Sequence, residues 1–419
     1  MRTTIFADQL IDGTGKAPVP DPVVVVEDGI ITQVSSGSPD AAPESEGGRV
    51  LDYRGCTLLP GLVDAHVHMN QPGDGTPFEE SMNQGDSFLG ASIAFAARRA
   101  LEAGITTVRD VGSRLETGFQ ARDALQRGYG EGARILLAGP PMTITGGHMR
   151  WYGGEVDGVD GVRAQVRRLI GKGADWIKIA GSGGGTPNTY SHLPSFRAEE
   201  VAAIADEAHR FGKKVTMHCL CAEAMHYAVQ AGVDGIEHGW FFVDEGKQQV
   251  FSPELAEMIA GAGLRVTTTL SVGQAILEAM DARPELTAEE QVYVDGWRRT
   301  RAETIEHFGR LRDHGVKFIG GTDAGWRYTR FDSMASEAWL MTEGGMTALE
   351  AIAACTGDSA EFLGLGGVTG RLAPGYEADL LAVGGDPLAD LRGLSDVRLV
   401  MQQGRVKVGG RLESDKVYR

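Results

Sequence analysis

Cysteine is scarce in this chain of 419 residues, which has only Cys56, Cys219, Cys221 and Cys355. Cys219 and Cys221 are too close in sequence for an easy disulfide, and no two cysteines have the C-x-x-C spacing of a zinc ribbon. This scarcity argues against a disulfide framework and against a cysteine-ligated zinc. We expect four free thiols.

Long apolar runs are also missing. No stretch approaches the ~18 consecutive apolar residues of a membrane-spanning helix. The first residues, MRTTIFADQLIDGTG, have no apolar segment after Arg2 and so do not resemble a secretory signal peptide. We therefore predict a cytoplasmic protein.

Basic residues are outnumbered by acidic ones. Lys and Arg total 40 against 57 Asp and Glu, which gives a formal net charge of -17. A charge of this sign argues against a nucleic acid or an anionic membrane as the partner. Hydrophobic residues make up 42% of the chain, which is enough for a real core, so we expect a globular protein.

Short β-rich runs alternate with helix-like segments from residue 58 onward. The runs are 58–68, 105–112, 133–140, 175–181, 213–219, 235–239, 264–270 and 316–325. The segments with helical periodicity are 86–103, 159–172, 197–211, 221–231 and 301–314. Strands that alternate with helices indicate a parallel α/β sheet, and eight such units indicate a TIM (β/α)8 barrel.

The longest stretches without regular periodicity are 141–158, 182–196 and 271–300. Each follows a predicted barrel strand, and the active sites of TIM barrels lie at the carboxyl ends of the strands. We therefore expect these stretches to be loops that build a pocket.

Both ends of the chain depart from this alternation. Residues 1–57 contain VVVVEDGIITQV, and residues 366–419 contain YEADLLAVGG and DVRLVMQQGRVKV, which are alternating or β-branched and punctuated by Gly and Pro. We interpret them as two halves of one small β-sandwich domain. The barrel domain would then span residues 58–365.

Two histidines lie one residue apart in DAHVHM, at the end of the first barrel strand. Side chains of a strand alternate between its faces, so His66 and His68 point the same way and could share a metal ion. Two hydrogen-bonded polar residues at a strand end would give the same pattern. Further ligands are needed to decide between these interpretations.

Other ligand-type residues end other predicted strands. His218 ends the fifth strand, His238 ends the sixth, and Asp323 ends the eighth. Four imidazoles and a carboxylate at the same end of a barrel form a set that suits divalent zinc. The pattern therefore predicts a metal centre.

Lys178 lies at the same level of the fourth strand, between two isoleucines. A protonated amine beside a metal ion is disfavoured by burial and by like charge. A neutral amine can react with carbon dioxide, and the carbamate could bridge two metal ions about 3.5–4 Å apart. The alternative is a lysine that extends to solvent or pairs with Asp175.

This arrangement of H-x-H, Lys, two His and Asp inside a split β-sandwich resembles the amidohydrolase superfamily with a binuclear metal centre. The segment GRLAPGYEADLLAVGGDPLADL is similar to the returning part of that superfamily's sandwich. The segment ITGGHMRWYGGEVDGVDGVRAQVRRLI resembles the imidazolonepropionase-related branch, which includes Xaa-Pro dipeptidase-like enzymes. The resemblance covers nearly the whole chain.

The resemblance implies a hydrolase that cleaves a C–N bond of an amide, a carbamate, an N-acyl amino acid or a dipeptide. It assigns the ligands of two divalent metal ions, expected to be zinc, by position: His66, His68 and Asp323 to one ion, His218 and His238 to the other, and carboxylated Lys178 to both. A hydroxide that bridges the two ions would attack the small-molecule substrate, and Asp323 would pass its proton to the leaving amine. Relatives are often homo-oligomers, and we expect the same here.

Three residues are candidates for substrate contact. The resemblance places His148 at the substrate carbonyl or carboxylate, Trp240 follows the ligand His238 by two residues, and Tyr190 lies on an expected pocket loop. Dipeptidase-like relatives carry a carboxylate-binding Tyr in an HAY motif, where this chain has Leu220. The departure favours a neutral amide or carbamate with an aromatic or bulky apolar group, although Arg150 and Arg327 on nearby loops could still bind a carboxylate.

Two other functions fit part of the pattern. A mononuclear deaminase of the same superfamily would carry a catalytic Glu three residues after the fifth-strand His, where this chain has Cys221, and Glu223 is two residues further on. A non-enzymatic scaffold would have no reason to keep every ligand. A binuclear hydrolase is therefore our prediction.

Overall fold

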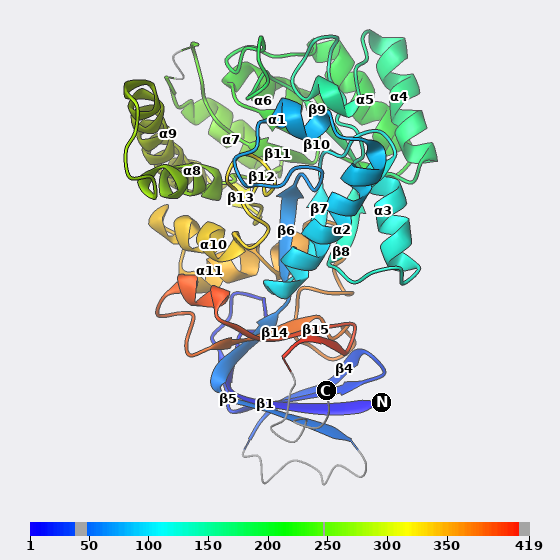
Figure 1. The fold of residues 1–419 in the computed structure, drawn as a ribbon, viewed down its shortest axis with the longest axis vertical. Helices are drawn as coiled ribbons and strands as arrows, with labels where there is room; N and C mark the ends of the chain where they lie inside the picture. The colour runs from blue at the N-terminus through cyan, green and yellow to red at the C-terminus, as the bar shows by residue number, and fades with distance from the viewer. Residues whose placement is uncertain (38–47, 246–247, 410–419) are drawn as a thin grey trace.

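The computed structural model describes residues 1–37, 48–245 and 248–409 of the chain. Figure 1 shows two stacked parts, with a ring of strands and helices above a smaller region of β-strands. The smaller region combines β1 to β5 from the start of the chain with β14 to β16 from its end. Distant parts of the sequence therefore meet in one region, as the sequence predicts.

The smaller region is one continuous sheet with the order β16-β15-β14-β5-β1-β3-β4, in which β2 also pairs with β1. Its strands are β1 (Arg2–Leu10), β2 (Val19–Pro20), β3 (Pro22–Glu27), β4 (Ile30–Ser36), β5 (Arg49–Pro60), β14 (Leu380–Gly384), β15 (Val397–Gln402) and β16 (Arg405–Val408). Apolar side chains of β1 and β3, such as Ile5 and Val24, share one core with Leu380 and Leu399 of β14 and β15. The sheet therefore folds over its own core as a sandwich.

The barrel consists of β6 (Leu62–Val67), β7 (Ile105–Asp110), β8 (Arg134–Leu137), β9 (Trp176–Ala180), β10 (Lys214–Cys219), β11 (Gly235–His238), β12 (Arg265–Thr267) and β13 (Lys317–Phe318). Parallel pairing joins β6 to β8 in one run and β9 to β13 in another.

Backbone hydrogen bonds close the ring between these two runs. At one seam the Met142 N–H donates to the Lys178 carbonyl at 2.9 Å, and at the other the Ala65 N–H donates to the Gly320 carbonyl at 3.0 Å. The predicted fold class, a TIM barrel with a β-sandwich built from both chain ends, is confirmed. The domain boundaries at residues 57 and 366 stay a prediction, and β5 runs through the first of them.

Helices surround the ring because each buries one apolar stripe against the strands. In α5, for example, Val201, Ile204 and Ala208 are buried at spacings of three and four residues. The covering helices are α1 (Phe78–Met82), α2 (Asp86–Glu102), α3 (Thr117–Gln126), α4 (Val159–Gly171), α5 (Ala198–Arg210), α6 (Ala222–Ala231), α7 (Pro253–Gly261), α10 (Met334–Glu343), α11 (Ala348–Ala354) and α12 (Gly357–Phe362). Within the described residues, none of the helices is both long and apolar enough to cross a membrane.

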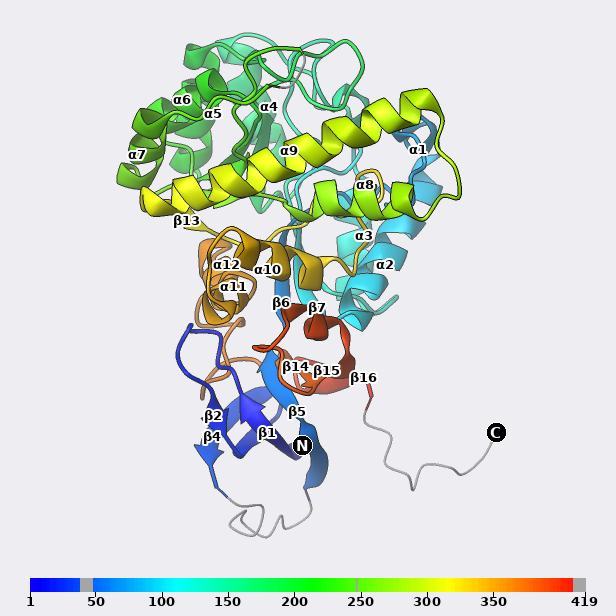
Figure 2. The ribbon, with the colours of Figure 1, turned by 90° about the vertical axis from the view of Figure 1, so that its left-hand side faces the viewer.

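The expected loop 271–300 is wrong, because it forms a helical hairpin. Helix α8 spans Ser271–Asp281, and the long helix α9 spans Ala288–Asp313, as Figure 2 shows across the face of the barrel. Thr287 accepts a hydrogen bond from the Glu290 N–H, and the Glu290 side chain accepts one from the Thr287 N–H. This reciprocal cap starts α9, and its T-x-x-E signature is present in the sequence.

Candidate functional site

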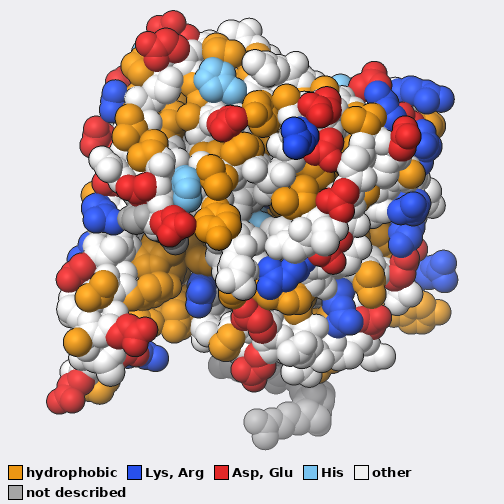
Figure 3. All heavy atoms as spheres, turned by 90° about the horizontal axis from the view of Figure 1, so that it is seen from above, with side chains coloured by type: hydrophobic (Ala, Val, Ile, Leu, Met, Phe, Trp, Pro, Cys, Tyr) orange, Lys and Arg blue, Asp and Glu red, His pale blue; other side chains and the backbone are white. Residues whose placement is uncertain are grey.

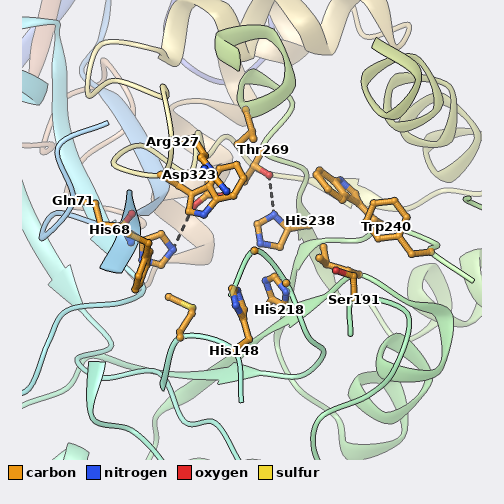
Figure 4. A pocket seen from close by; sticks show the side chains of 18 of the residues that line it. His68, Gln71, His148, Ser191, His218, His238, Trp240, Thr269, Asp323 and Arg327 are labelled. Carbon is orange, nitrogen blue, oxygen red and sulfur yellow. Dashed lines mark hydrogen bonds and ion pairs between the residues drawn. The ribbon is translucent and has the colours of Figure 1, made fainter. Parts of the chain in front are cut away.

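A cavity opens at the carboxyl ends of the barrel strands. Its lining includes Lys178 of β9, His218 of β10, His238 of β11 and Asp323 after β13. In the view from above, hydrophobic side chains line a recess between the projecting arm at the lower left and the main body (Figure 3). Figure 4 shows the labelled histidines and Asp323 turned toward one another inside the cavity.

His66 in β6 and His68 directly after it, called the β6 histidines below, converge on one carboxylate, as their spacing predicts. His66 Nε2 lies 3.4 Å and His68 Nε2 lies 3.3 Å from Asp323 Oδ1. His66, His238 and Asp323 each place one potential ligand atom within 4.8 Å of the other two. The rings of His218 and His238 lie 4.6 Å apart, so all four imidazoles gather in one group, the histidine wall.

Each imidazole of the histidine wall uses one nitrogen on a protein hydrogen-bond partner. His66 Nδ1 lies 2.8 Å from Glu237 Oε2, an oxygen of a carboxylate that can only accept. The Thr269 hydroxyl donates to the Thr268 carbonyl, so its oxygen accepts from His238 Nδ1 at 2.9 Å. His66 and His238 therefore carry their hydrogen on Nδ1 and present the lone pair of Nε2 inward.

The other two imidazoles donate to backbone carbonyls. His68 Nδ1 lies 3.4 Å from the Gly112 oxygen, and His218 Nε2 lies 3.1 Å from the Gly183 oxygen. Each ring keeps its second nitrogen as an acceptor or ligand. Gly112 is required beside His68, because a Cβ there would lie 2.5 Å from His68 Nδ1.

Two buried atoms at the centre of this group have no hydrogen-bond partner among the described residues, His66 Nε2 and Asp323 Oδ1. Buried polar atoms are almost always satisfied, so such a pair requires an explanation. A lone pair of nitrogen beside a carboxylate oxygen repels unless a proton or a cation lies between them. The donor set of neutral imidazoles and a carboxylate therefore fits a divalent metal ion.

Burial sets the protonation of the imidazoles. It lowers the pKa of His66 to about 4 and the pKa of His68, His218 and His238 well below their ordinary value. Burial also raises the pKa of the Asp323 carboxyl well above its ordinary value, against the opposing effect of Lys178. The histidines are therefore neutral, as metal ligands must be.

Lys178 is almost fully buried, with 1% of its surface exposed, so it does not extend to solvent. Asp175 is not its partner, because the Asp175 carboxylate accepts from Arg122 at 3.1 Å and from the Leu137 N–H at 2.9 Å. Burial lowers the pKa of the Lys178 amine to about 8. Burial therefore increases the neutral fraction of the amine, which is the form that reacts with carbon dioxide.

Backbone strain concentrates at the same strand ends. His238, Thr269 and Asp323 adopt left-handed conformations with φ of 71°, 52° and 60°. Residues other than glycine rarely adopt this conformation, which costs on the order of 1–3 kcal/mol each. Such strain indicates that the fold holds these three side chains in a fixed orientation.

His148 lies across the cavity from the β6 histidines, with its ring 4.6 Å from that of His218. Its Nδ1 lies 2.8 Å from the Thr186 hydroxyl, which also accepts from the Met149 N–H. Burial, with help from Lys178 and Arg150, lowers the pKa of His148 to about 3, so the ring is neutral. A Cβ on Gly184 would lie 2.6 Å from His148 Nε2, which explains a glycine at that position.

The other predicted substrate contacts have different outcomes. Trp240 lines the cavity, whereas Tyr190 is 51% exposed and only its neighbour Ser191 contributes to the lining. Arg327 lines the mouth, but Arg150 donates to the Pro187 carbonyl and lies over the Trp151 ring outside the cavity. The prediction that Tyr190 contacts the substrate rests only on its place in a loop, and the loop turns its ring outward.

Aromatic side chains form the side of the cavity opposite the β6 strand. We call this the aromatic wall, and its members are Trp240, Phe242, Tyr293, Trp297 and Trp326. Trp240 contacts Phe242 and Trp297 edge-on, with ring centres 5.4 and 6.3 Å apart. The centre of its ring lies 5.8 Å from that of His238. The buried Nε1 of Trp240 has no hydrogen-bond partner among the described residues.

Three functional residues escape the sequence analysis: Glu237, Arg109 and Thr269. The signal for Glu237 and Arg109 is a charged residue in the middle of a buried barrel strand, in GIEHG and ITTVRD. Burial alone would raise the pKa of Glu237, but Arg109, His66 and Lys178 outweigh it and hold that pKa well below its ordinary value. Glu237 is therefore an ionised carboxylate inside the barrel.

The deaminase alternative lacks its glutamate. Cys221 is the residue three positions after His218, and it is buried as the N-cap of α6 (Ala222–Ala231). Glu223 is exposed on α6, where it accepts a hydrogen bond from Tyr227 at 2.5 Å. Neither residue lines the cavity.

Comparison with known proteins gives consistent matches over the whole chain. The sequence pattern described as the amidohydrolase family matches residues 57–407. The chain is 28% identical to ochratoxinase of Aspergillus niger, over 98% of this chain and 86% of that protein. It is 26% identical to imidazolonepropionase of Deinococcus deserti, over 92% of this chain and 91% of that protein.

Solved structures agree with these sequence matches. A crystal structure of a Xaa-Pro dipeptidase with bound methionine in the active site superposes with a TM-score of 0.85 at 29% identity, over 98% of this chain and 100% of that one. The crystal structure of A. niger ochratoxinase superposes with a TM-score of 0.81 at 26% identity, over 97% and 96% of the two chains.

Proposed function

The chain belongs to the amidohydrolase family of hydrolases, and we propose that it cleaves an amide or carbamate bond with the help of two divalent metal ions, zinc by preference. The proposed ligands are His66, His68, Lys178 in carboxylated form, His218, His238 and Asp323. The observation that carries the proposal is the pair of unpartnered buried atoms, His66 Nε2 and Asp323 Oδ1, at the centre of four neutral imidazoles.

The number of ligands supports two ions rather than one. Six candidate ligands exceed the four of a tetrahedral zinc site. Lys178 supports the same conclusion, because a buried amine with a pKa of about 8 can become an anionic carbamate that two ions share. When bound, the ions would supply an activated water as nucleophile and polarise the scissile carbonyl.

Asp323 is the proposed general base and acid. Its Oδ1 faces both β6 histidines at the bottom of the cavity. A carboxylate at this position can accept a proton from the attacking water and deliver it to the leaving amine. Its left-handed backbone, φ 60°, fixes the direction of the side chain.

His148 is the proposed hydrogen-bond donor to the substrate. The imidazole is neutral, so it can donate from only one nitrogen, and Thr186 occupies the Nδ1 side. Its Nε2 is then the atom available to the substrate carbonyl oxygen. The substrate carbonyl would make this contact where a water molecule could otherwise bind.

The substrate that the cavity favours is a neutral amide or carbamate with an aromatic or bulky apolar group. Leu220 lies where carboxylate-binding relatives are expected to carry Tyr, and it packs in one apolar cluster with Trp240 and Phe242. Arg327 is the one arginine that lines the mouth within the described residues, and it is exposed. A carboxylate desolvated against this apolar cluster would lose roughly 2–5 kcal/mol that an exposed arginine recovers poorly.

One relative is named a Xaa-Pro dipeptidase and another an ochratoxinase, and neither name decides whether the substrate of this chain is neutral or carries a carboxylate. Comparing kcat/KM for an N-acyl amino acid and for its carboxamide decides between these two substrate types. We expect the carboxamide to be the better substrate, and we expect His148→Ala to impair both. A preference of about tenfold or more for the free acid would restore the dipeptidase-like function.

Cytoplasmic location and homo-oligomerisation stay predictions from the sequence. The substrate itself is a small molecule, because the metal ligands lie in a cavity at the strand ends rather than on an open face.

A further inference from the structure

Glu237 lies in the interior of the barrel, directly beneath the histidine wall, and has no exposed surface. It belongs to β11, one residue before His238. Its Oε2 lies 2.8 Å from His66 Nδ1, and its Oε1 accepts from Arg109 Nη2 at 2.6 Å and from the Thr216 hydroxyl. One carboxylate therefore has three partners, each from a different barrel strand.

Arg109 is held in place around this carboxylate. It has no exposed surface, its Nε donates to the Ala65 carbonyl at 2.7 Å, and its guanidinium lies 4.5 Å from the centre of the Trp176 ring. A buried guanidinium needs a counter-charge, which Glu237 provides. Arg109 thus fixes both the charge and the direction of the carboxylate that contacts His66.

His66 differs from the rest of the histidine wall in the charge of its outer partner. His68 and His218 face backbone carbonyls, and His238 faces the Thr269 hydroxyl. Within residues 1–37, 48–245 and 248–409, only His66 of these four has a carboxylate on its outer nitrogen. A carboxylate partner fixes the tautomer and makes the opposite nitrogen a stronger donor to a metal.

We propose that Glu237 is a positioning residue for the metal centre, which holds the lone pair of His66 Nε2 toward the ion-binding side while Arg109 holds Glu237. The proposal rests on the metal-dependent function proposed above. Two residues of the barrel interior would then contribute to metal affinity, although neither Glu237 nor Arg109 lines the cavity.

The test is Glu237→Gln. A glutamine keeps the shape, but it has one acceptor oxygen for His66, Arg109 and Thr216, and its amide group must face one of them as a donor. We expect metal affinity to fall by roughly 10–100-fold, as for other outer partners of metal ligands. The probe is Co²⁺ titrated into metal-free protein, with the visible absorption of the bound ion as a readout that is independent of turnover.

Glu207→Gln is the matched control. Glu207 of α5 is likewise buried, with 2% exposed, and accepts from Arg163 and Arg167 of α4 at 3.0 Å each. It bridges α5 to α4, and neither Glu207 nor its partners Arg163 and Arg167 line the cavity. We expect this variant to lower the melting temperature and leave Co²⁺ affinity and the Co²⁺ spectrum unchanged.

Thr216→Val is a milder second variant, which removes one hydrogen bond from Glu237 and keeps side-chain shape. We expect a loss of Co²⁺ affinity of a few-fold, and this variant decides the proposal if Glu237→Gln does not fold. Unchanged Co²⁺ affinity and spectrum in Glu237→Gln, or in Thr216→Val where the first does not fold, would overturn the role of Glu237 and leave the metal-dependent function standing. Wild-type protein that binds no Co²⁺ or Zn²⁺ would overturn both.

Discussion

The two walls of the cavity are built on different principles. The histidine wall comes from strand ends, where backbone hydrogen bonds of the barrel and outer partners such as Glu237 and Thr269 fix each ring. The aromatic wall comes largely from α9 and from the loops that the α8–α9 hairpin packs against, and its rings contact one another in edge-on and tilted pairs. In the function proposed here, the histidine wall would carry out the reaction and the aromatic wall would select the substrate.

This difference predicts which kinetic parameter changes when a residue of each wall is replaced. Changes in the histidine wall, in Asp323 or in Lys178 should lower kcat and metal content together. Changes in the aromatic wall should act mainly through KM, because packing against the substrate stabilises the ground state and the transition state alike.

Lys178→Ala should have the largest effect. We expect activity to be lost together with much of the metal, because alanine cannot supply the bridging anion. Added short-chain carboxylates should partly restore both, since they can occupy the space of the carbamate. Metal analysis and activity assays with and without propionate check this, and a wild-type rate without rescue would show that Lys178 has a structural role only.

Asp323→Asn should come next. An amide oxygen can still face the β6 histidines, so we expect metal binding to weaken only in part. Turnover should fall by roughly 10²–10⁴-fold, because an amide cannot accept and deliver a proton. Steady-state kinetics on the metal-loaded variant provide the measurement, and unchanged turnover would remove Asp323 from the proton transfer.

Trp240→Phe probes the aromatic wall. A smaller aromatic ring replaces the indole, and the buried, unpartnered Nε1 donor is lost. We expect kcat/KM for an aromatic amide to fall by about 2–10-fold through KM, with kcat nearly unchanged. Trp339→Phe, the same chemical change on α10 outside the cavity, is the control. A fall in kcat instead of a rise in KM would mean that Trp240 acts with the histidine wall.

The smallest effect on turnover is expected at Glu337, which supports the start of α8. Its carboxylate accepts from the Leu270 and Ser271 N–H groups at 3.0 and 2.7 Å. Burial raises its pKa from 4.5 to about 7, so between these pH values the folded protein binds more protons than the unfolded chain. The free energy of unfolding should therefore fall as pH rises through this range.

Comparison with Glu337→Gln isolates this contribution, because glutamine does not titrate. Relative to that variant, wild-type stability should decrease by on the order of 1–3 kcal/mol from pH 5 to pH 7 in denaturant unfolding of the metal-free proteins. A difference that is constant with pH would show that Glu337 does not titrate in this range.

The carboxyl ends of the strands in a parallel barrel lie at one face. The histidine wall could therefore be predicted once the strands were recognised in the sequence. His218, His238 and Asp323 each end a β-rich run, and alternation places His66 and His68 on one face. Their approach to one another in the structure follows from the fold alone. Asp323 follows β13 by five residues, and its left-handed backbone is a local detail that the sequence pattern does not contain.

The aromatic wall could not be predicted in the same way. Trp297 and Tyr293 belong to α9, in a stretch expected as loop, and they reach the cavity only because the hairpin folds back over the barrel. Tyr190 and Ser191 are neighbours in sequence, and the local backbone decides which of them faces the cavity. The partners of Glu237 come from β6, β7 and β10, so its role depends on tertiary contacts that no local pattern contains.

Metal content of fully active protein tests the central claim most directly. Protein purified without chelators and supplied with zinc and bicarbonate should contain about two divalent ions per chain by elemental analysis, and activity should rise in proportion as the second ion is restored to metal-free protein. Full activity at a single equivalent would contradict the binuclear centre and leave Lys178 without a bridging role.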